Sequence, residues 1–163
     1  MAKQRERRLS QMTPASMISG NATSRLQTNE GNSQAVDRPD RALVVTPHPD
    51  DAEIGYGGTI AGWIAQGTEV AYVLCTNGDK GSGDAEMTSD RLAEIRAKEQ
   101  AEAADELGVK DVIYLAYPDG ALEDTAEFRG DLVKAIRTHT PDVVLCPDRF
   151  RQGFYLHRDH RIC

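Results

Sequence analysis

The chain has 163 residues, 39% hydrophobic and 28% charged, a composition typical of one globular domain. Residues 41–163 carry thirteen Lys and Arg against twenty-two Asp and Glu, and this acidic balance argues against nucleic acid or an anionic membrane as the main partner. No apolar run is long enough to span a bilayer.

Residues 1–40 are rich in Ser, Asn, Gln, Arg and Thr and lack a sustained apolar period, which predicts a disordered N-terminal extension. Three cysteines without a hydrophobic signal sequence indicate reduced thiols and a cytoplasmic location. Cys75 and Cys146 lie at the ends of apolar runs, so we expect both to be small core residues. Two strands apart, at about 9–10 Å, they are too distant for a disulfide.

The first predicted strand, residues 42–46, ends at a turn that carries one histidine and two carboxylates. Two prolines flank His48 and stiffen the backbone, and Asp50 and Asp51 follow. Stiffness suits a metal or catalytic site. The alternative is a solvated loop in which one aspartate caps the next helix, and this segment alone does not separate the two.

The rest of the chain alternates between predicted helices and strands, with Gly67 and Gly108 ending the first two helices. The residues between the second strand and the second helix form a flexible, glycine-rich loop that we expect at the rim of a pocket. The predicted helices are residues 54–66, 88–107 and 128–138, and the later strands are 69–75, 111–115 and 143–146.

This alternation predicts an α/β fold with a parallel sheet covered on both faces, and we expect a Rossmann-like three-layer arrangement with strand order 3-2-1-4. In that order the first and fourth strands are neighbours, and the chain reverses direction between them. Ligands bind beyond the carboxyl ends of the strands at such a switch point. The turn after the first strand should therefore lie close to the segment after the fourth.

That later segment contains a second polar motif, His157-Arg158-Asp159-His160. With His48, the two motifs hold three of the four histidines in the chain. Only His139 lies outside them, and we expect it on the surface near a helix C-terminus. Imidazoles and a carboxylate with open coordination positions suit catalytic Zn²⁺, with Fe²⁺ as the alternative.

The two motifs, in this order and spacing, resemble the PIG-L/LmbE-like zinc-dependent N-deacetylases, which act on N-acetylglucosamine-containing substrates. The resemblance rests on residues 47–55 and 157–160 and extends from about Arg41 to the last residue. It implies that residues 41–163 are the N-terminal portion of a deacetylase domain. The C-terminal part of that domain, a helix and further strands in the family, is expected to be missing.

The resemblance implies a catalytic site at these motifs. His48, Asp51 and His160 would bind the zinc ion. Asp50 would be the general base that takes a proton from the zinc-bound water. His157 would stabilise the oxyanion and protonate the departing amine.

Further residues receive roles from the same resemblance. Arg96 would reach the substrate, and Asp119 would contact sugar hydroxyls; the alternatives are an Arg96–Glu99 surface pair and an aspartate that only shapes its turn. Apart from the resemblance, Asp159 stands between His157 and His160 and is expected to orient one of the histidines, with simple solvation as the alternative.

The resemblance predicts a hydrolase that releases acetate from a small N-acetylated sugar or glycoconjugate, and it leaves a homo-oligomer open. A truncated, metal-binding but inactive fragment is the main alternative. The second is an Fe(II) oxygenase with two histidines and one carboxylate, since His48 and Asp50 have the required His-x-Asp spacing. Those oxygenases are commonly jelly-roll proteins, which the predicted α/β fold disfavours.

Overall fold

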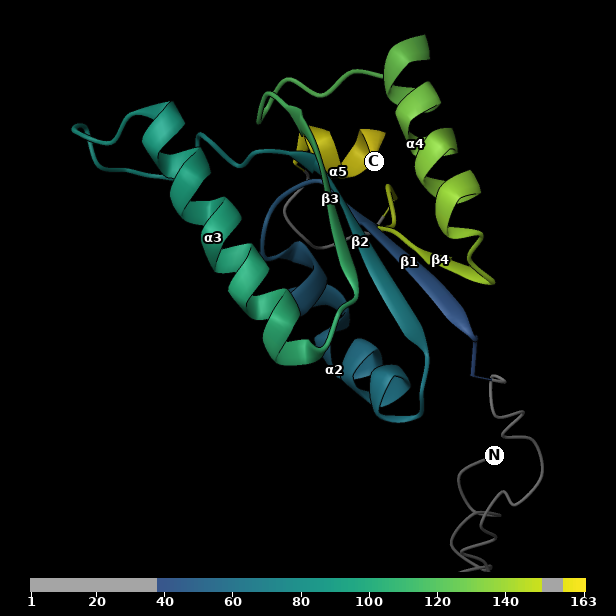
Figure 1. The fold of residues 1–163 in the computed structure, drawn as a ribbon. Helices are drawn as coiled ribbons and strands as arrows, with labels where there is room; N and C mark the ends of the chain where they lie inside the picture. The colour runs from purple at the N-terminus through teal and green to yellow at the C-terminus, as the bar shows by residue number, and fades with distance from the viewer. Residues whose placement is uncertain (1–37, 151–156) are drawn as a thin grey trace, which may run out of the picture. The chain divides into compact units, whose positions relative to one another are not determined.

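A computed structural model describes residues 38–150 and 157–163, so nearly all of the predicted N-terminal extension lies outside the described residues. The predicted strands and helices are present within three residues of their expected ends, and a further short helix near the end of the chain holds residues 158–160 of the second polar motif (Figure 1). In chain order the elements are β1 (Arg41–Thr46), α2 (Asp51–Ala65), β2 (Glu69–Thr76), α3 (Ser89–Leu107), β3 (Asp111–Tyr117), α4 (Ala126–His139), β4 (Val143–Leu145) and α5 (Arg158–Ile162).

The sheet has the order β3-β2-β1-β4, and every pairing is parallel, which confirms the predicted topology. Leu43 of β1 pairs with Ala71 of β2 on one side and with Val144 of β4 on the other. After their first residue, β1 and β2 are buried along their whole length. Such continuous apolar runs are typical of parallel strands covered on both faces.

Alternate residues of the central strands enter two separate cores, as the period of two in a strand requires. Leu43 and Val45 pack toward α4 with Phe128, whereas Val44 packs toward α2 and α3 with Ile60. Figure 1 shows α2 and α3 on one side of the sheet and α4 on the other. The predicted three-layer arrangement is therefore confirmed.

Threonine side chains cap the starts of α3 and α4, and a glycine ends α3. Thr88 accepts a hydrogen bond from the backbone N–H of Arg91 at the start of α3, and Thr125 does the same for Phe128 at the start of α4. Gly108 ends α3 at a φ of 81°, a left-handed conformation that glycine adopts without steric cost. These ends set which turns of α3 face the strand termini.

The cysteine prediction is right for Cys75, which is buried, and wrong for Cys146, which is exposed. The reason is that β4 ends at Leu145, so Cys146 already lies beyond the sheet. The neighbour of Cys75 is Cys163, whose Sγ is 3.5 Å away. His139 is the last residue of α4, as expected, although it is half-buried rather than fully on the surface. None of the described helices is long and apolar enough to cross a membrane.

Phe128→Ala should lower the free energy of unfolding by about 3–5 kcal/mol, because it empties a buried site. The Phe128 ring is 1% exposed and packs edge-on against Tyr117 with ring centroids 5.4 Å apart. Urea denaturation followed by circular dichroism measures the loss. Phe150→Ala removes the same ring from a side chain that is 73% exposed, and should change stability by less than about 0.5 kcal/mol. Equal losses for the two variants would contradict this packing.

Candidate metal centre

The turn after β1 is anchored to the neighbouring strand. The Pro47 carbonyl accepts hydrogen bonds from both the backbone N–H and the Oγ1 of Thr76, each at 2.8 Å. The backbone N–H of His48 donates to Asp51 Oδ2 at 3.0 Å. These contacts hold the His48 and Asp51 side chains close to each other at the C-terminal end of β1.

Asp50 stands at the N-cap position of α2, but its side chain makes no capping hydrogen bond. Its backbone has φ 88° and ψ −23°, the left-handed region that non-glycine residues rarely occupy. Its Oδ2 accepts from Arg96 Nη2 at 2.8 Å instead. The alternative of an ordinary capping aspartate is therefore not what the structure contains.

The three predicted metal ligands come together from the turn after β1, the first residue of α2 and the helix α5. His48 Nδ1 lies 3.2 Å from Asp51 Oδ2, and His160 Nε2 lies 3.4 Å from the same oxygen. The ligand atoms of the three residues all lie within 4.8 Å of one another. Ligand atoms around a tetrahedral zinc ion are roughly 3.4 Å apart, so this donor set fits such an ion in chemistry and in spacing.

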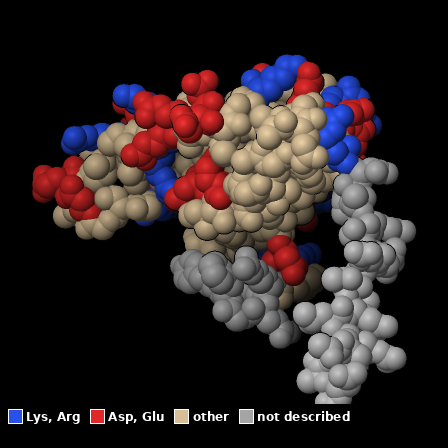
Figure 2. All heavy atoms as spheres, turned by 90° about the horizontal axis from the view of Figure 1, so that it is seen from below, with Lys and Arg blue, Asp and Glu red and all other residues tan. Residues whose placement is uncertain are grey.

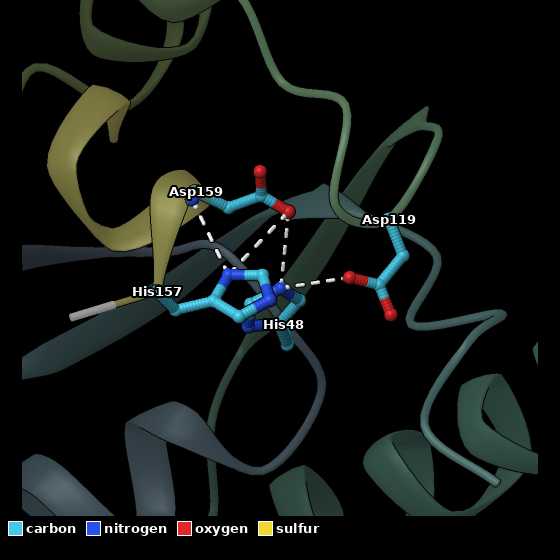
Figure 3. Close-up of side chains that lie close together, drawn as sticks. All are labelled: His48, Asp119, His157 and Asp159. Atoms are coloured by element: carbon cyan, nitrogen blue, oxygen red, sulfur yellow. Dashed lines mark hydrogen bonds and ion pairs between the residues drawn. The ribbon is translucent and has the colours of Figure 1, made fainter. Parts of the chain in front are cut away.

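A second group of donors shares His48 (Figure 3). His48 Nε2 lies 3.0 Å from Asp119 Oδ1 and 3.2 Å from Asp159 Oδ2. The His157 ring stands edge-on to the His48 ring, with centroids 4.6 Å apart. The structure thus places Asp119, predicted as a substrate residue, directly against His48.

The carboxylate of Asp159 is fully buried and ties α5 to the loop after β3. Its Oδ2 accepts from the backbone N–H of Gly120 at 2.7 Å, and its Oδ1 from that of Leu122 at 3.2 Å. Its contact with His48 agrees with the expected orienting role. Its two backbone contacts were not foreseen, because nothing in the sequence connects residues that are 37 and 39 positions apart.

Charge around His48 favours a cation. Burial by itself lowers the pKa of His48, but the hydrogen bond and charge of Asp51, the charge of Asp119 and the hydrogen bond to Asp159 outweigh it and raise the pKa above its ordinary value. Burial lowers the pKa of His160, with only partial opposition from Asp51, which favours the neutral ring that a metal needs.

Arg96 reaches the turn from α3. Its Nη2 donates to the Pro49 carbonyl at 2.8 Å, and its Nη1 to the Gly78 carbonyl at 3.4 Å. A Cβ atom built on Gly81 would lie 2.6 Å from Arg96 Nη1, so a larger residue there would displace the guanidinium. The glycine-rich loop therefore packs over Arg96.

The alternative of a surface pair with Glu99 does not hold, because the ion pair of Arg96 is with Asp50. Burial raises the pKa of the Asp50 carboxyl, and the Arg96 guanidinium opposes this rise. Arg96 thus acts on the turn rather than on the surface of its own helix.

Sequence reasoning missed Gln100, which is 2% exposed and lies one turn after Arg96 on α3. Its Oε1 accepts from the backbone N–H of Asp50 at 2.8 Å, and its Nε2 donates to Glu53 Oε1 at 2.9 Å. One signal was available in the sequence, since Gln100 is eight residues after the apolar Leu92 and so falls on the same side of the helix.

The acidic balance of the chain appears as a mixed surface. Figure 2 shows red acidic and blue basic side chains close together on one face of the described residues, rather than a continuous basic surface. The absence of a nucleic-acid partner stays a prediction.

The protein-family model described as PIG-L, GlcNAc-PI de-N-acetylase, matches residues 43–163. The diacetylchitobiose deacetylase of Thermococcus kodakarensis is 40% identical over 121 residues, which cover 74% of this chain and 45% of that protein. The mycothiol S-conjugate amidase of Streptomyces coelicolor is 33% identical over 142 residues, covering 74% and 47%. The chain therefore spans about half the length of these curated relatives.

Two solved structures show the same fold with different chemistry. The N,N'-diacetylchitobiose deacetylase of Pyrococcus horikoshii superposes with a TM-score of 0.73 at 42% identity, covering 76% of this chain and 46% of that one. The 4-carboxy-2-hydroxymuconate hydratase GalB of Pseudomonas putida KT2440 gives 0.68 at 26% identity, covering 76% and 52%. Shared fold alone thus does not identify the reaction.

Asp159→Asn should lower the free energy of unfolding by about 1–3 kcal/mol in the metal-free protein. The asparagine side chain keeps one accepting oxygen, but its NH2 group can only donate, so the backbone N–H of either Gly120 or Leu122 loses its partner. Urea denaturation measures the change. Asp124→Asn is the matched control, because that carboxylate is 63% exposed in a surface pair with Arg129 and its loss should cost less than about 1 kcal/mol. No difference between the two variants would show that the buried contacts are weak.

Proposed function

The chain belongs to the GlcNAc-PI de-N-acetylase (PIG-L) family, and from this premise we propose that the protein is a metal-dependent amide hydrolase that removes the acetyl group from an N-acetylglucosamine-type substrate. The observation that carries the proposal is the convergence of His48, Asp51 and His160 at the carboxyl end of β1. Support comes from relatives whose names are those of deacetylases and an amidase.

His48, Asp51 and His160 would hold the metal, with Zn²⁺ favoured by two nitrogen donors and one oxygen donor and Fe²⁺ as the alternative. When bound, such an ion lowers the pKa of a coordinated water and polarises an amide carbonyl. The second donor group is the weaker candidate, because both oxygens of Asp159 already accept backbone hydrogen bonds. Asp159 would then hold the His48 ring in place.

Asp50 would act as the general base. Asp50 lies in the turn after β1, directly before Asp51. Its carboxylate is 56% exposed. Arg96 contacts Oδ2, and no described residue donates a hydrogen bond to Oδ1, which leaves that oxygen for proton transfer from water. The guanidinium also fixes the rotamer of the carboxylate.

His157 would stabilise the oxyanion and protonate the amine. It is the N-cap residue of α5, and its Nδ1 accepts from the backbone N–H of Asp159 at 3.3 Å. In a neutral ring this bond assigns the hydrogen to Nε2, so Nε2 is the donor that can face the substrate. This hydrogen bond at the start of α5 supports the tautomer that the proposed role requires.

Arg96 and Asp119 would contact the substrate, which we propose to be a small N-acetylated sugar or a glycoconjugate. Asp119 is 6% exposed, and besides His48 it accepts from the backbone N–H of Lys80 at 3.3 Å. It therefore connects the glycine-rich loop to the site, and a carboxylate there can accept hydrogen bonds from sugar hydroxyls. The cytoplasmic location and a homo-oligomeric state stay predictions.

The alternative functions differ from a deacetylase in what they consume or release. An Fe(II) oxygenase would consume oxygen, and a hydratase like GalB would add water across a double bond without releasing acetate. An inactive metal-binding fragment would hold Zn²⁺ without turnover. Acetate release from N-acetylglucosamine conjugates by the 163-residue chain, measured with a coupled enzymatic assay, separates the deacetylase from all three.

His160→Ala should lower the affinity for Zn²⁺ by at least about 100-fold, because it removes one of three ligands. Competition with a chromogenic chelator measures the dissociation constant. His139→Ala removes an imidazole from the far end of α4 and should leave the affinity unchanged. If His160→Ala kept its Zn²⁺ while Asp119→Ala lost it, the second donor group would be the metal site.

Asp50→Asn should keep Zn²⁺ bound and lower kcat by about 10²- to 10⁴-fold, because the amide cannot take a proton. Metal content by atomic emission and initial rates of acetate release measure the two effects. Asp84→Asn, an exposed change in the glycine-rich loop, serves as the control. Near-normal turnover in Asp50→Asn would remove Asp50 from the role of base.

A further inference from the structure

The peptide group between Pro49 and Asp50 is held at both ends by one helix. Arg96 Nη2 donates to its carbonyl oxygen at 2.8 Å, and Gln100 Oε1 accepts from its N–H at 2.8 Å. The carbonyl and N–H of a trans peptide point in opposite directions. Arg96 and Gln100, on consecutive turns of α3, therefore bind the two opposite edges of this one peptide group.

These two hydrogen bonds oppose a rotation of the Pro49–Asp50 peptide that would relieve the backbone strain at Asp50. Asp50 has a φ of 88°, which costs a non-glycine residue roughly 1–2 kcal/mol. Rotating the Pro49–Asp50 peptide by half a turn would bring that φ to about −90°, an ordinary value. The rotation would also point the carbonyl oxygen at the oxygen of Gln100 and the N–H at the guanidinium of Arg96. Both contacts would become repulsive.

A hydrogen bond to Glu53 sets the orientation of the Gln100 side-chain amide. Its Nε2 donates to Glu53 Oε1 at 2.9 Å, and an ionised carboxylate can only accept. The oxygen of Gln100 must therefore face Asp50. Glu53 is half-buried, with its Oε2 atom buried and the fully buried Tyr72 beside it. The contacts thus connect the core of the sheet to the turn.

We propose that Gln100 is a positioning residue of the metal centre, which keeps the Pro49–Asp50 peptide in its strained orientation and so directs the carboxylates of Asp50 and Asp51. This rests on the proposed function for the role of Asp50 as a base. It goes beyond that function in assigning a residue that touches neither metal nor substrate. The required chemistry is an acceptor facing Asp50 and a donor facing Glu53.

Gln100→Met removes the acceptor at nearly constant volume and helix propensity. Three measurements on the full 163-residue chain test it: hydrogen exchange of the Asp50 amide by NMR without metal, Zn²⁺ affinity by chelator competition, and kcat with KM. We expect the exchange protection at Asp50 to be lost, and Zn²⁺ affinity and kcat each to fall by about 10- to 100-fold. KM should change by less than about threefold, because the lost contact orients the base rather than the substrate.

Exchanging the amide of Gln100 with the carboxylate of Glu53 should restore the lost hydrogen bonds. Gln100→Glu alone places two carboxylates together and should reproduce the loss in Zn²⁺ affinity. Glu53→Gln/Gln100→Glu restores one donor and one acceptor in reversed order, and should return exchange protection and Zn²⁺ affinity to within about threefold of the unmodified protein. Ala101→Glu adds the same charge on the exposed side of the same turn of α3 and is the matched control.

The swap also keeps the test decisive if Gln100→Met fails to fold, because the doubly substituted protein retains every hydrogen bond. Failure of the swap to recover Zn²⁺ affinity while the chain stays folded would overturn the proposal, as would unchanged affinity and kcat in Gln100→Met with Asp50 exchange increased. Absence of acetate release by the unmodified chain would contradict the proposed function alone. The exchange and Zn²⁺ measurements would still decide the role of Gln100.

Discussion

The parallel pairing of β1 with both β2 and β4 is the constraint on which the candidate site depends. Parallel strands present their carboxyl ends at one edge of the sheet, and each must be followed by a crossover. The turn after β1 and the segment after β4 consequently emerge side by side. His48 and His160, 112 positions apart in the chain, are brought to a ring-centroid distance of 5.3 Å by this arrangement.

Electrostatics then distinguishes this edge from an ordinary polar surface. One imidazole, that of His48, stands within hydrogen-bond distance of three carboxylates. Like charges at such spacing repel unless a cation lies among them, and either a protonated ring or a metal ion supplies it. Since metal binding requires the ring to lose its proton, a protonated His48 and a metal ion bound there would exclude each other. Asp159 is one of the three carboxylates beside His48, and it also joins α5 to the loop after β3.

The helix α3 supports the site from the other side. Its inner face combines ordinary apolar packing, through Leu92 and Ala104, with polar contacts from Arg96 and Gln100 to the turn. A strained backbone persists only where its surroundings hold it, and Asp50 is held by the rigid body of a 19-residue helix. The same fold serves deacetylases and a hydratase among its neighbours, so the chemistry lies in such local side-chain arrangements rather than in the sheet.

The sequence by itself determined the order of the strands and which turns would meet. Buried runs such as those of β1 and β2 are recognisable from composition, crossovers are right-handed, and the position of a motif at a strand end follows from both. The proximity of the two motifs followed from the expected strand order, whereas the choice of His48, Asp51 and His160 among their residues came from the family resemblance. Tertiary structure alone decided that Asp119 and Asp159 both contact His48, that Gln100 binds the Asp50 amide, and that Cys146 is exposed. Periodicity gives the face of an element but not the atom opposite it, because that depends on how distant elements pack against one another.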